Sequence, residues 1–352
     1  MTTLTIQVPR MMKAVVTTAE KTIALEEVPV PEIDDDEILV KTTALAQNPT
    51  DWKYVKFIGN PSTIVGVDFA GVVVKVGSAV TAPSVGTKVA GFVHGGQYKD
   101  RGAFAEYVKT AAELVWEVPE SSTSDVEAAA MGCGAWTAVQ TLFHPTRLGL
   151  VEPPDRTPGE EWVFIYGGST SVGMYAIQLA HFAGYKVATV ASPNHHDLLR
   201  SYGADLILDY RDPTAAIAKI KETTGNSIHH ALDAVSSPDT QIFTVKTFAP
   251  GRAKLLVIVH ISPEAQALRP DVEFEHFILY TTHGRAFGTY PARPDDKKHM
   301  TRFLKKFPEL VKSGALKSNP TKLFEGGLEG ISDGFEYMIA GKVSGEKIVY
   351  EV

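Results

Sequence analysis

The feature that most constrains the fold is the stretch WVFIYGGSTSVGMYAIQLAHFAGYKVATVAS, residues 162–192. Five mostly apolar residues indicate a buried strand, a glycine-marked turn follows, and an apolar-patterned helix then leads into a second strand. A strand that opens into a helix leaves backbone N–H groups without helical acceptors at the helix N terminus, where they suit a phosphate. The stretch therefore predicts a βαβ unit with an anion-binding turn.

The turn departs from the strict dinucleotide-binding pattern G-x-G-x-x-G. Gly168 and Gly173 satisfy the pattern, but Thr170 stands where the second glycine would be. A plain strand-to-helix turn with capping hydroxyls is the alternative, and the surrounding βαβ pattern favours dinucleotide binding. The predicted cofactor contacts in this turn are Gly167, Gly168, Ser169, Thr170, Ser171, Val172 and Gly173.

The end of the second strand bears on which dinucleotide is bound. NAD-binding units usually carry an acidic residue there, which bonds the ribose 2′-hydroxyl. This chain has Ser192, Asn194 and His195 instead, so no carboxylate repels a 2′-phosphate and NADPH is the predicted cofactor. Tyr210 and Arg211, at the end of the next strand, are the predicted helpers, with a solvated strand end as the alternative.

The rest of the chain divides by periodicity. Short strand-like runs separated by Gly and Pro predict a barrel or sandwich up to about residue 130, and Ala-rich helical sequence follows. From residue 162, strands and helices alternate, which predicts an α/β domain with a doubly wound parallel sheet. KLLVIVH (254–260) and GRAFGTY (284–290) are expected to extend that sheet, and GEKIVYEV (345–352) to pair with a strand already folded.

Composition excludes several classes of protein. The 352 residues suffice for two domains, and a net charge of −7 gives no basic surface for nucleic acid or anionic membrane. No apolar run approaches the roughly 20 residues that a membrane span needs. The single cysteine, Cys133, forms no internal disulfide and is expected to be a small buried residue. We expect a soluble, cytoplasmic protein.

Several motifs together resemble the medium-chain dehydrogenase/reductase superfamily over nearly the whole chain. They include GVDFAGVVVKVG (66–77), GAFAEYV (102–108), the turn GGSTSVG (167–173) and SGEKIVYEV (344–352). The resemblance implies a GroES-like β-barrel catalytic domain, residues 1–135 and 295–352, and a Rossmann NADPH-binding domain, residues 136–294.

The zinc ligands of that superfamily are not matched. Asn48 and Val67 occupy the positions where its zinc alcohol dehydrogenases carry Cys and His. The rings of the adjacent pairs His195–His196 and His229–His230 diverge within each pair, so neither pair suits a metal. We therefore expect no metal site and a zinc-independent oxidoreductase.

The segment NPTDWKYV (48–55) is similar to an N-x-x-D-x-Y element of zinc-free reductases, with Lys53 in place of the tyrosine. That departure resembles the fungal trans-acting enoyl reductases and differs from Tyr-dependent quinone and enone reductases. The resemblance implies that Lys53, Thr137 and Asn48 are catalytic, and that Gly288 and Lys347 contact the cofactor.

The implied activity is hydride transfer from NADPH to the carbon–carbon double bond of an α,β-unsaturated carbonyl compound. One alternative is an accessory enoyl reductase for thioesters on a polyketide synthase carrier protein, with the charged segment 296–307 as a docking candidate. A quinone oxidoreductase is a second alternative, and a non-catalytic binding protein, against which the glycine turn argues, is a third. Monomer and homodimer both stay open.

Overall fold

The computed structural model describes residues 7–119 and 121–352, and these fall into two compact units. The first unit contains the chain up to Cys133, together with Tyr280–Gly314 and Ser318–Val352, and the second contains Gly134–Leu279 and Ala315–Lys317. Residues 280–294 were expected in the nucleotide-binding domain, and the structure places them in the first unit. The aromatic rings of Tyr280 and Phe287 explain this, because both pack against His94 of that unit.

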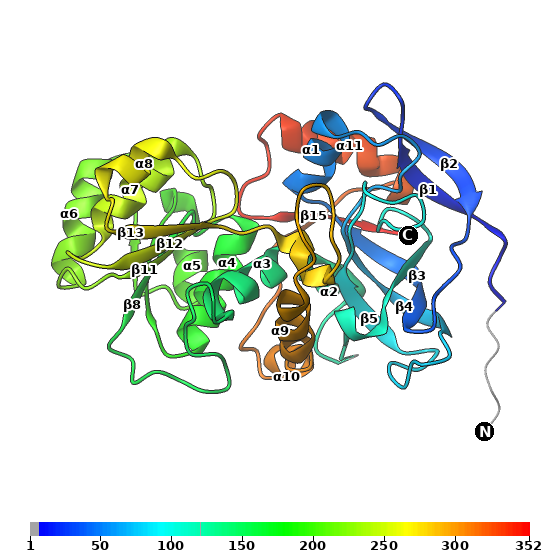
Figure 1. Ribbon diagram of the computed structural model, residues 1–352, viewed down its shortest axis with the longest axis horizontal. Helices are drawn as coiled ribbons and strands as arrows, with labels where there is room; N and C mark the ends of the chain where they lie inside the picture. The colour runs from blue at the N-terminus through cyan, green and yellow to red at the C-terminus, as the bar shows by residue number, and fades with distance from the viewer. Residues whose placement is uncertain (1–6, 120) are drawn as a thin grey trace. The chain divides into compact units, whose positions relative to one another are not determined.

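The first unit is built on mainly antiparallel sheets with short helices (Figure 1). Its strands are β1 (Met11–Thr17), β2 (Ile23–Pro29), β3 (Glu37–Ala46), β4 (Asp68–Val76), β5 (Lys88–Phe92), β6 (Tyr107–Ala111), β7 (Val115–Glu117), β14 (Thr321–Leu323) and β15 (Lys347–Glu351). Its helices are α1 (Pro49–Phe57), α2 (Asp125–Ala130), α9 (Pro294–Leu304), α10 (Phe307–Lys312), α11 (Ile331–Ile339), and the 3-10 turns η1 (Ala112–Leu114) and η4 (Gly327–Gly330).

The larger sheet of this unit has the order β14-β15-β3-β4-β5-β7, with β6 paired to β3, and β1 and β2 form a separate ladder. Among the described strands of this unit, only β14 and β15 pair in parallel. The C-terminal strand β15 lies antiparallel to β3, as the sequence predicted for residues 345–352. Alternating apolar residues of β3, β4 and β15 meet in one core that includes Val40, Phe69 and Tyr350. This arrangement brings residue 347 beside the start of α1.

The second unit is a six-stranded parallel sheet with the order β10-β9-β8-β11-β12-β13. This is the Rossmann strand order, and it reverses between β8 and β11. The strands are β8 (Trp162–Tyr166), β9 (Lys186–Val190), β10 (Leu206–Leu208), β11 (His230–Asp233), β12 (Ala253–Val257) and β13 (Val272–His276). The helices are α3 (Cys133–Phe143), α4 (Ser171–Phe182), α5 (His196–Ser201), α6 (Pro213–Thr223), α7 (Pro238–Thr247), α8 (Pro263–Leu268), and the 3-10 turns η2 (Pro193–His195) and η3 (Leu279–His283), the last of which runs into the first unit.

Two sequence expectations about this sheet need correction. GRAFGTY (284–290) is not a strand of it; Phe287 and Tyr290 pair with each other in a loop of the first unit. The outer strand of the sheet is β13. Its sequence VEFEH was not recognised as a strand, because charged residues alternate with apolar ones at a sheet edge. In the first unit, the charged segment 296–307 runs along α9 to its end at Leu304 and reaches the start of α10 at Phe307.

Candidate active site

The glycine turn after β8 lies where the strand order reverses, and close backbone contacts fix its shape. Gly167 has a φ of 79°, which favours glycine. A Cβ atom on Gly173 would lie 2.2 Å from the carbonyl oxygen of Gly167, so α4 packs against the turn too closely for any side chain. This tight cradle is where a Rossmann fold accepts a pyrophosphate.

Thr170 explains why the second glycine of the strict pattern is dispensable here. Its side-chain oxygen accepts a hydrogen bond from the Gly173 N–H at 3.0 Å and caps α4. Its hydroxyl also donates to the Gly167 carbonyl at 2.8 Å. The hydroxyl of Thr170 is therefore committed to shaping the turn, and Ser169 and Ser171, both partly exposed, stand beside it.

The remaining predicted cofactor residues of the second unit gather at the same edge of the sheet. Val190 of β9 pairs with Leu208 of β10, so Ser192, Asn194 and His195 follow one strand end and Tyr210 and Arg211 follow its neighbour. The exposed Arg211 guanidinium forms a two-pronged ion pair with Asp209, with N–O distances of 2.6–3.0 Å. Asp209 thus offsets part of the positive charge predicted to meet a 2′-phosphate.

Asp233, which the sequence reasoning missed, ends β11 on the other side of the strand-order reversal. Its carboxylate is fully buried and accepts hydrogen bonds from the Thr240 hydroxyl at 2.6 Å and from the Ser236 N–H at 2.7 Å. Burial raises the pKa of Asp233 to about 6, against the lowering effect of these donors. Asp233 therefore holds the loop between β11 and α7 in place.

A second polar group, which we call the Asn48 cluster, consists of Asn48, Asp68 and Lys347 in the first unit. The Lys347 ammonium lies 3.0 Å from Asp68 Oδ2 and also donates to Asn48 Oδ1. Asn48 Nδ2 donates to Asp68 Oδ2 at 2.8 Å, and the Cys133 N–H donates to Asp68 Oδ1 at 2.6 Å. The side chains of Lys347 and Asp68 are 2% and 0% exposed. Both polar atoms of the Asn48 amide are thus used inside the protein.

The Asn48 cluster changes how the predicted role of Lys347 is understood. Lys347 was predicted to contact the cofactor, and the structure places its ammonium inside this buried group. Burial raises the pKa of Asp68 even though Lys347 and Asn48 act to lower it. Asp68 was not singled out from the sequence, because a strand aspartate carries no signal of its partner 279 residues away.

Lys53, Thr137 and Gly288 occupy three different environments. Lys53 is exposed on α1, 5.7 Å from the Trp52 ring centroid, and pairs with no carboxylate in the part of the chain that the structure describes. Thr137 is buried in α3 of the second unit, where its carbonyl accepts from the Thr141 hydroxyl. Gly288 lies in an exposed loop of the first unit with a φ of 52°.

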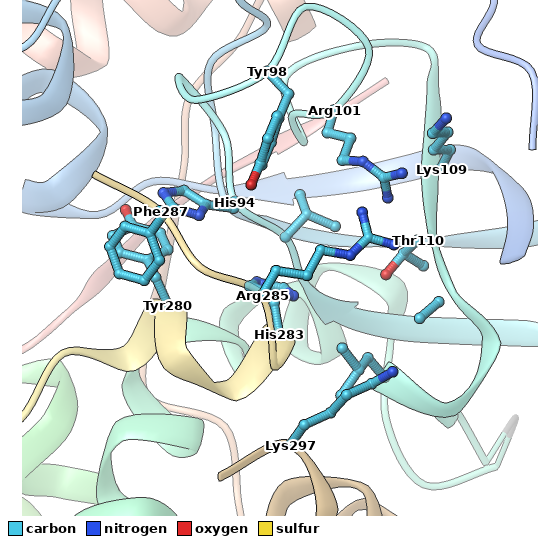
Figure 2. Close-up of a pocket in the computed structure, with 13 residues that line it drawn as sticks. His94, Tyr98, Arg101, Lys109, Thr110, Tyr280, His283, Arg285, Phe287 and Lys297 are labelled. Atoms are coloured by element: carbon cyan, nitrogen blue, oxygen red, sulfur yellow. The ribbon is translucent and has the colours of Figure 1, made fainter. Parts of the chain in front are cut away.

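A pocket inside the first unit was also missed by the sequence reasoning (Figure 2). His94 stacks on Tyr280 with ring centroids 3.8 Å apart and meets Phe287 edge-on at 4.9 Å. The buried Nε2 atoms of His94 and His283 have no hydrogen-bond partner among the described residues. Nothing in the sequence pointed to the distant segment 280–297 as one of the walls of this pocket.

His94 predicts a specific pH dependence of stability. Burial lowers its pKa to about 3, so the folded protein keeps this ring neutral where the unfolded chain, at an ordinary pKa near 6.5, takes up a proton. His94 therefore lowers stability progressively as the pH falls below 6.5. Relative to the native protein, His94→Phe should gain about 2 kcal/mol of unfolding free energy between pH 6.5 and pH 5, measured by urea denaturation. A difference that stays constant with pH would show that His94 takes up its proton as readily in the folded protein as in the unfolded chain.

Among residues 7–119 and 121–352, no three His, Cys, Asp or Glu side chains are grouped so that they could hold a metal ion. In the same part of the chain, no helix is both long and apolar enough to cross a membrane.

Comparison with known proteins gives a consistent family assignment. Residues 34–120 match the family described as alcohol dehydrogenase GroES-like domain, and residues 171–305 match the zinc-binding dehydrogenase family. A trans-enoyl reductase of Alternaria alternata is 33% identical over 345 residues, covering 97% of this chain and 98% of that protein. A trans-enoyl reductase of Gibberella zeae is 34% identical and covers 93% of both chains.

Solved structures show the same fold. A putative zinc-dependent alcohol dehydrogenase from Rhizobium etli superposes with a TM-score of 0.82 at 25% identity, over 98% of this chain and 99% of that one. A mycobacterial protein solved in complex with NADPH superposes with a TM-score of 0.75 at 20% identity, over 97% of this chain and 100% of that one.

Proposed function

This chain belongs to the medium-chain dehydrogenase/reductase superfamily, and on that premise we propose that it is an NADPH-dependent reductase of the carbon–carbon double bond in α,β-unsaturated carbonyl compounds. The observation that carries the proposal is the glycine turn at the strand-order reversal, in a chain aligned along almost its full length with trans-enoyl reductases.

The residues of the turn fit a nicotinamide dinucleotide. The close approach of Gly173 to the Gly167 carbonyl keeps a side chain out of that point of the turn, and the N terminus of the 12-residue helix α4 favours negative charge. When bound, the cofactor supplies the hydride. The residues of this chain bind it, orient the substrate and keep water away.

NADPH rather than NADH is the preferred form in this proposal. No carboxylate follows β9 at Ser192, Asn194 or His195, and the Arg211 side chain is exposed at the neighbouring strand end. The Asp209–Arg211 pair reduces this preference without removing it, since an exposed guanidinium keeps donors available. The ratio of kcat/KM for NADPH to that for NADH measures the preference, and a ratio of one or below would contradict it.

The catalytic residue in this proposal is Lys53, whose ammonium group stabilises the charge that develops on the substrate. Negative charge develops on the substrate carbonyl oxygen as hydride reaches the β-carbon, and an ammonium group aimed at that oxygen lowers the barrier. Lys53 suits this role because its ammonium is exposed and has no carboxylate partner in the described chain. Thr137 orients the bound groups, and Asn48 acts through the Asn48 cluster, which holds the start of α1.

Lys53→Met is expected to lower kcat/KM for an enoyl thioester by about 10²-fold, the scale of losing one oxyanion-stabilising donor. Lys56→Met is the matched control, because Lys56 is also exposed on α1 and also lies near the Trp52 ring, at 6.0 Å. NADPH consumption with each variant provides the measurement. Equal losses in the two variants would assign the effect to the charge of the helix rather than to Lys53.

A further inference from the structure

The pocket of the first unit presents an unusual charge pattern for a chain with a net charge of −7. Four of its lining residues are basic, and none is Asp or Glu; the basic ones are Arg101, Lys109, Arg285 and Lys297. We propose that this pocket binds an anionic oxygen group, a phosphate or a carboxylate, carried by the substrate at a distance from its double bond. The inference rests on the proposed function, because it names the class of substrate that the reductase prefers.

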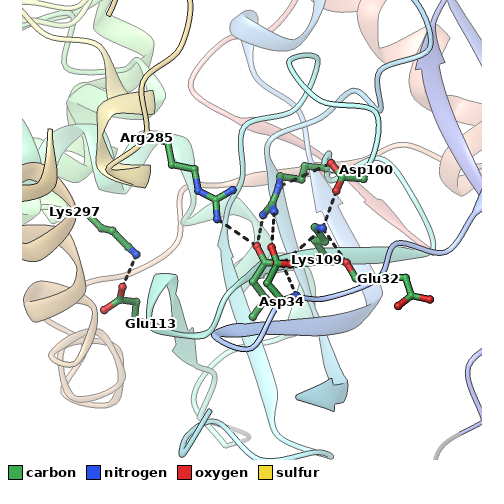
Figure 3. A network of polar contacts seen from close by, with 9 residues as sticks. Glu32, Asp34, Asp100, Lys109, Glu113, Arg285 and Lys297 are labelled. Atoms are coloured by element: carbon green, nitrogen blue, oxygen red, sulfur yellow. Dashed lines mark hydrogen bonds and ion pairs between the residues drawn. The ribbon is translucent and has the colours of Figure 1, made fainter. Parts of the chain in front are cut away.

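The basic side chains form ion pairs with carboxylates that do not line the pocket (Figure 3). Glu37 is fully buried and contacts Arg101 at 2.5 Å, Lys109 at 3.7 Å and Arg285 at 3.5 Å. Burial acts to raise the pKa of Glu37, but the hydrogen bonds from Arg101 and the Asp34 N–H and the charges of Arg101 and Lys109 lower it below its usual value. One carboxylate is therefore shared by three cations.

The other carboxylates of the network are more exposed to water. Asp100 contacts Lys109 at 2.7 Å and is 48% exposed, Asp34 is 69% exposed, and Glu113, which pairs with Lys297 at 2.5 Å, is 50% exposed. Solvent screens exposed charges more strongly than buried ones. The cations Arg101 and Lys109 are only 13% and 8% exposed, so water screens their charges less than it screens those of Asp34, Asp100 and Glu113.

Arg285 is the residue best placed to take a ligand. Its side chain is 48% exposed, and its ion pair within the described part of the chain is the long contact to the shared Glu37. Figure 2 shows the guanidinium groups of Arg285 and Arg101 pointing toward each other inside the pocket. Two guanidinium forks that face one space offer the paired N–H donors that phosphate and carboxylate oxygens accept.

The opposite side of the pocket is aromatic. Tyr280, Phe287 and Tyr98 surround His94, which is 4% exposed and whose Nε2 atom has no partner among the described residues. An unsatisfied polar atom in a lined pocket indicates a place for a ligand group. The pocket therefore suits a small anionic group better than a neutral one. Phosphate on a coenzyme-A or carrier-type thioester and carboxylate on a free unsaturated acid are the two sources of such a group.

The test compares substrates that share one enoyl group but differ in charge. The full-length protein with NADPH is assayed with crotonyl-coenzyme A, with the neutral N-acetylcysteamine thioester, and with a carboxylate-bearing enone and its methyl ester. We expect a KM at least about tenfold lower for one anionic substrate than for its neutral partner, a difference of about 1.4 kcal/mol. The phosphate and carboxylate arms identify the source.

Arg285→Gln should raise the KM of the preferred anionic substrate about tenfold more than it raises the KM of the neutral partner, so that the difference between the two substrates is lost. Arg293→Gln is the matched control, an exposed arginine in the same loop that does not line the pocket. Equal KM values for charged and neutral substrates, or equal effects of Arg285→Gln on both, would overturn the inference while turnover of the neutral thioester left the proposed function standing. If no substrate is turned over, isothermal titration calorimetry measures the binding of phosphopantetheine and of the unsaturated carboxylic acid to the native protein and to the Arg285→Gln variant. Equal affinities of the two proteins for both ligands would overturn the inference.

Discussion

Lys347→Met is expected to lower the free energy of unfolding by about 3–5 kcal/mol, the cost of removing one partner of a buried ion pair. The Lys347 ammonium and Asp68 are almost completely buried and lie 3.0 Å apart. Without the ammonium, Asp68 keeps its hydrogen bonds from Asn48 and Cys133 but loses its countercharge. Urea denaturation followed by tryptophan fluorescence measures the loss.

Two further variants make this prediction specific. Lys342→Met, at an exposed lysine near the same end of the chain, should change stability by less than about 0.5 kcal/mol. The double variant Asp68→Asn with Lys347→Met should recover most of the loss, because it leaves no buried charge in the Asn48 cluster. A single variant as stable as the native protein would show that Lys347 does not pair with Asp68.

The loss of unfolding free energy in Lys347→Met should also depend on pH, in the direction set by the titration of Asp68. Its pKa is raised by burial, and removal of Lys347 raises it further. A folded-state pKa above the unfolded value means that the folded protein binds the proton more readily, so stability is lost as the pH rises through the folded pKa. Lys347→Met should therefore be more destabilising at pH 7 than at pH 5. The opposite order would contradict this account of the Asn48 cluster.

Gly173→Ala is expected to raise the Kd for NADPH by about 10- to 100-fold, which corresponds to about 1.4–2.7 kcal/mol. Its Cβ would stand 2.2 Å from the Gly167 carbonyl oxygen, a backbone atom that moves only with the turn itself. The start of α4 must then shift away from the cradle, which also costs about 1–3 kcal/mol of stability. Fluorescence titration with NADPH measures the affinity.

Val172→Ala is the control for this change, because it shortens the neighbouring side chain in the same helical turn and leaves the backbone in place. We expect it to change NADPH affinity by less than about threefold, since residue 172 at a helix N terminus would contact the cofactor through its backbone N–H, which the substitution leaves in place. Thermal denaturation of both variants separates loss of binding from loss of folding. Native affinity in a folded Gly173→Ala protein would show that the turn does not contact the cofactor.

The fold could be predicted from the sequence where one local pattern decides it. The alternation of apolar strands and helices from residue 162 to 257 predicted β8, β9, β10, β11 and β12, because parallel strands buried on both faces are continuously apolar. β13 was not predicted because an edge strand tolerates charged residues, as in its sequence VEFEH. The assignment of residues 280–294 to the first unit was not predicted, because it depends on ring packing between Tyr280 and His94, which are 186 residues apart in the sequence.

The candidate site was predictable to a similar degree. The glycine turn is a local feature: Gly173 lies where α4 packs against the Gly167 carbonyl, and Thr170 caps α4, whereas contact of these residues with a cofactor stays a prediction. The Asn48 cluster and the basic pocket depend on contacts between segments far apart in the chain, so no motif indicates Asp68, Glu37 or Arg285. Long-range packing of charged residues, which has no period, is what the sequence did not reveal.

The most direct test of the central claim uses NADPH deuterated at its transferable position and an enoyl thioester as substrate. Mass spectrometry and NMR of the product then locate the label. Hydride transfer to the double bond predicts a saturated thioester with deuterium on the β-carbon and none on the α-carbon. A product that keeps its double bond and carries the deuterium on the former carbonyl carbon, or NADPH consumption without labelled product, would contradict the proposal.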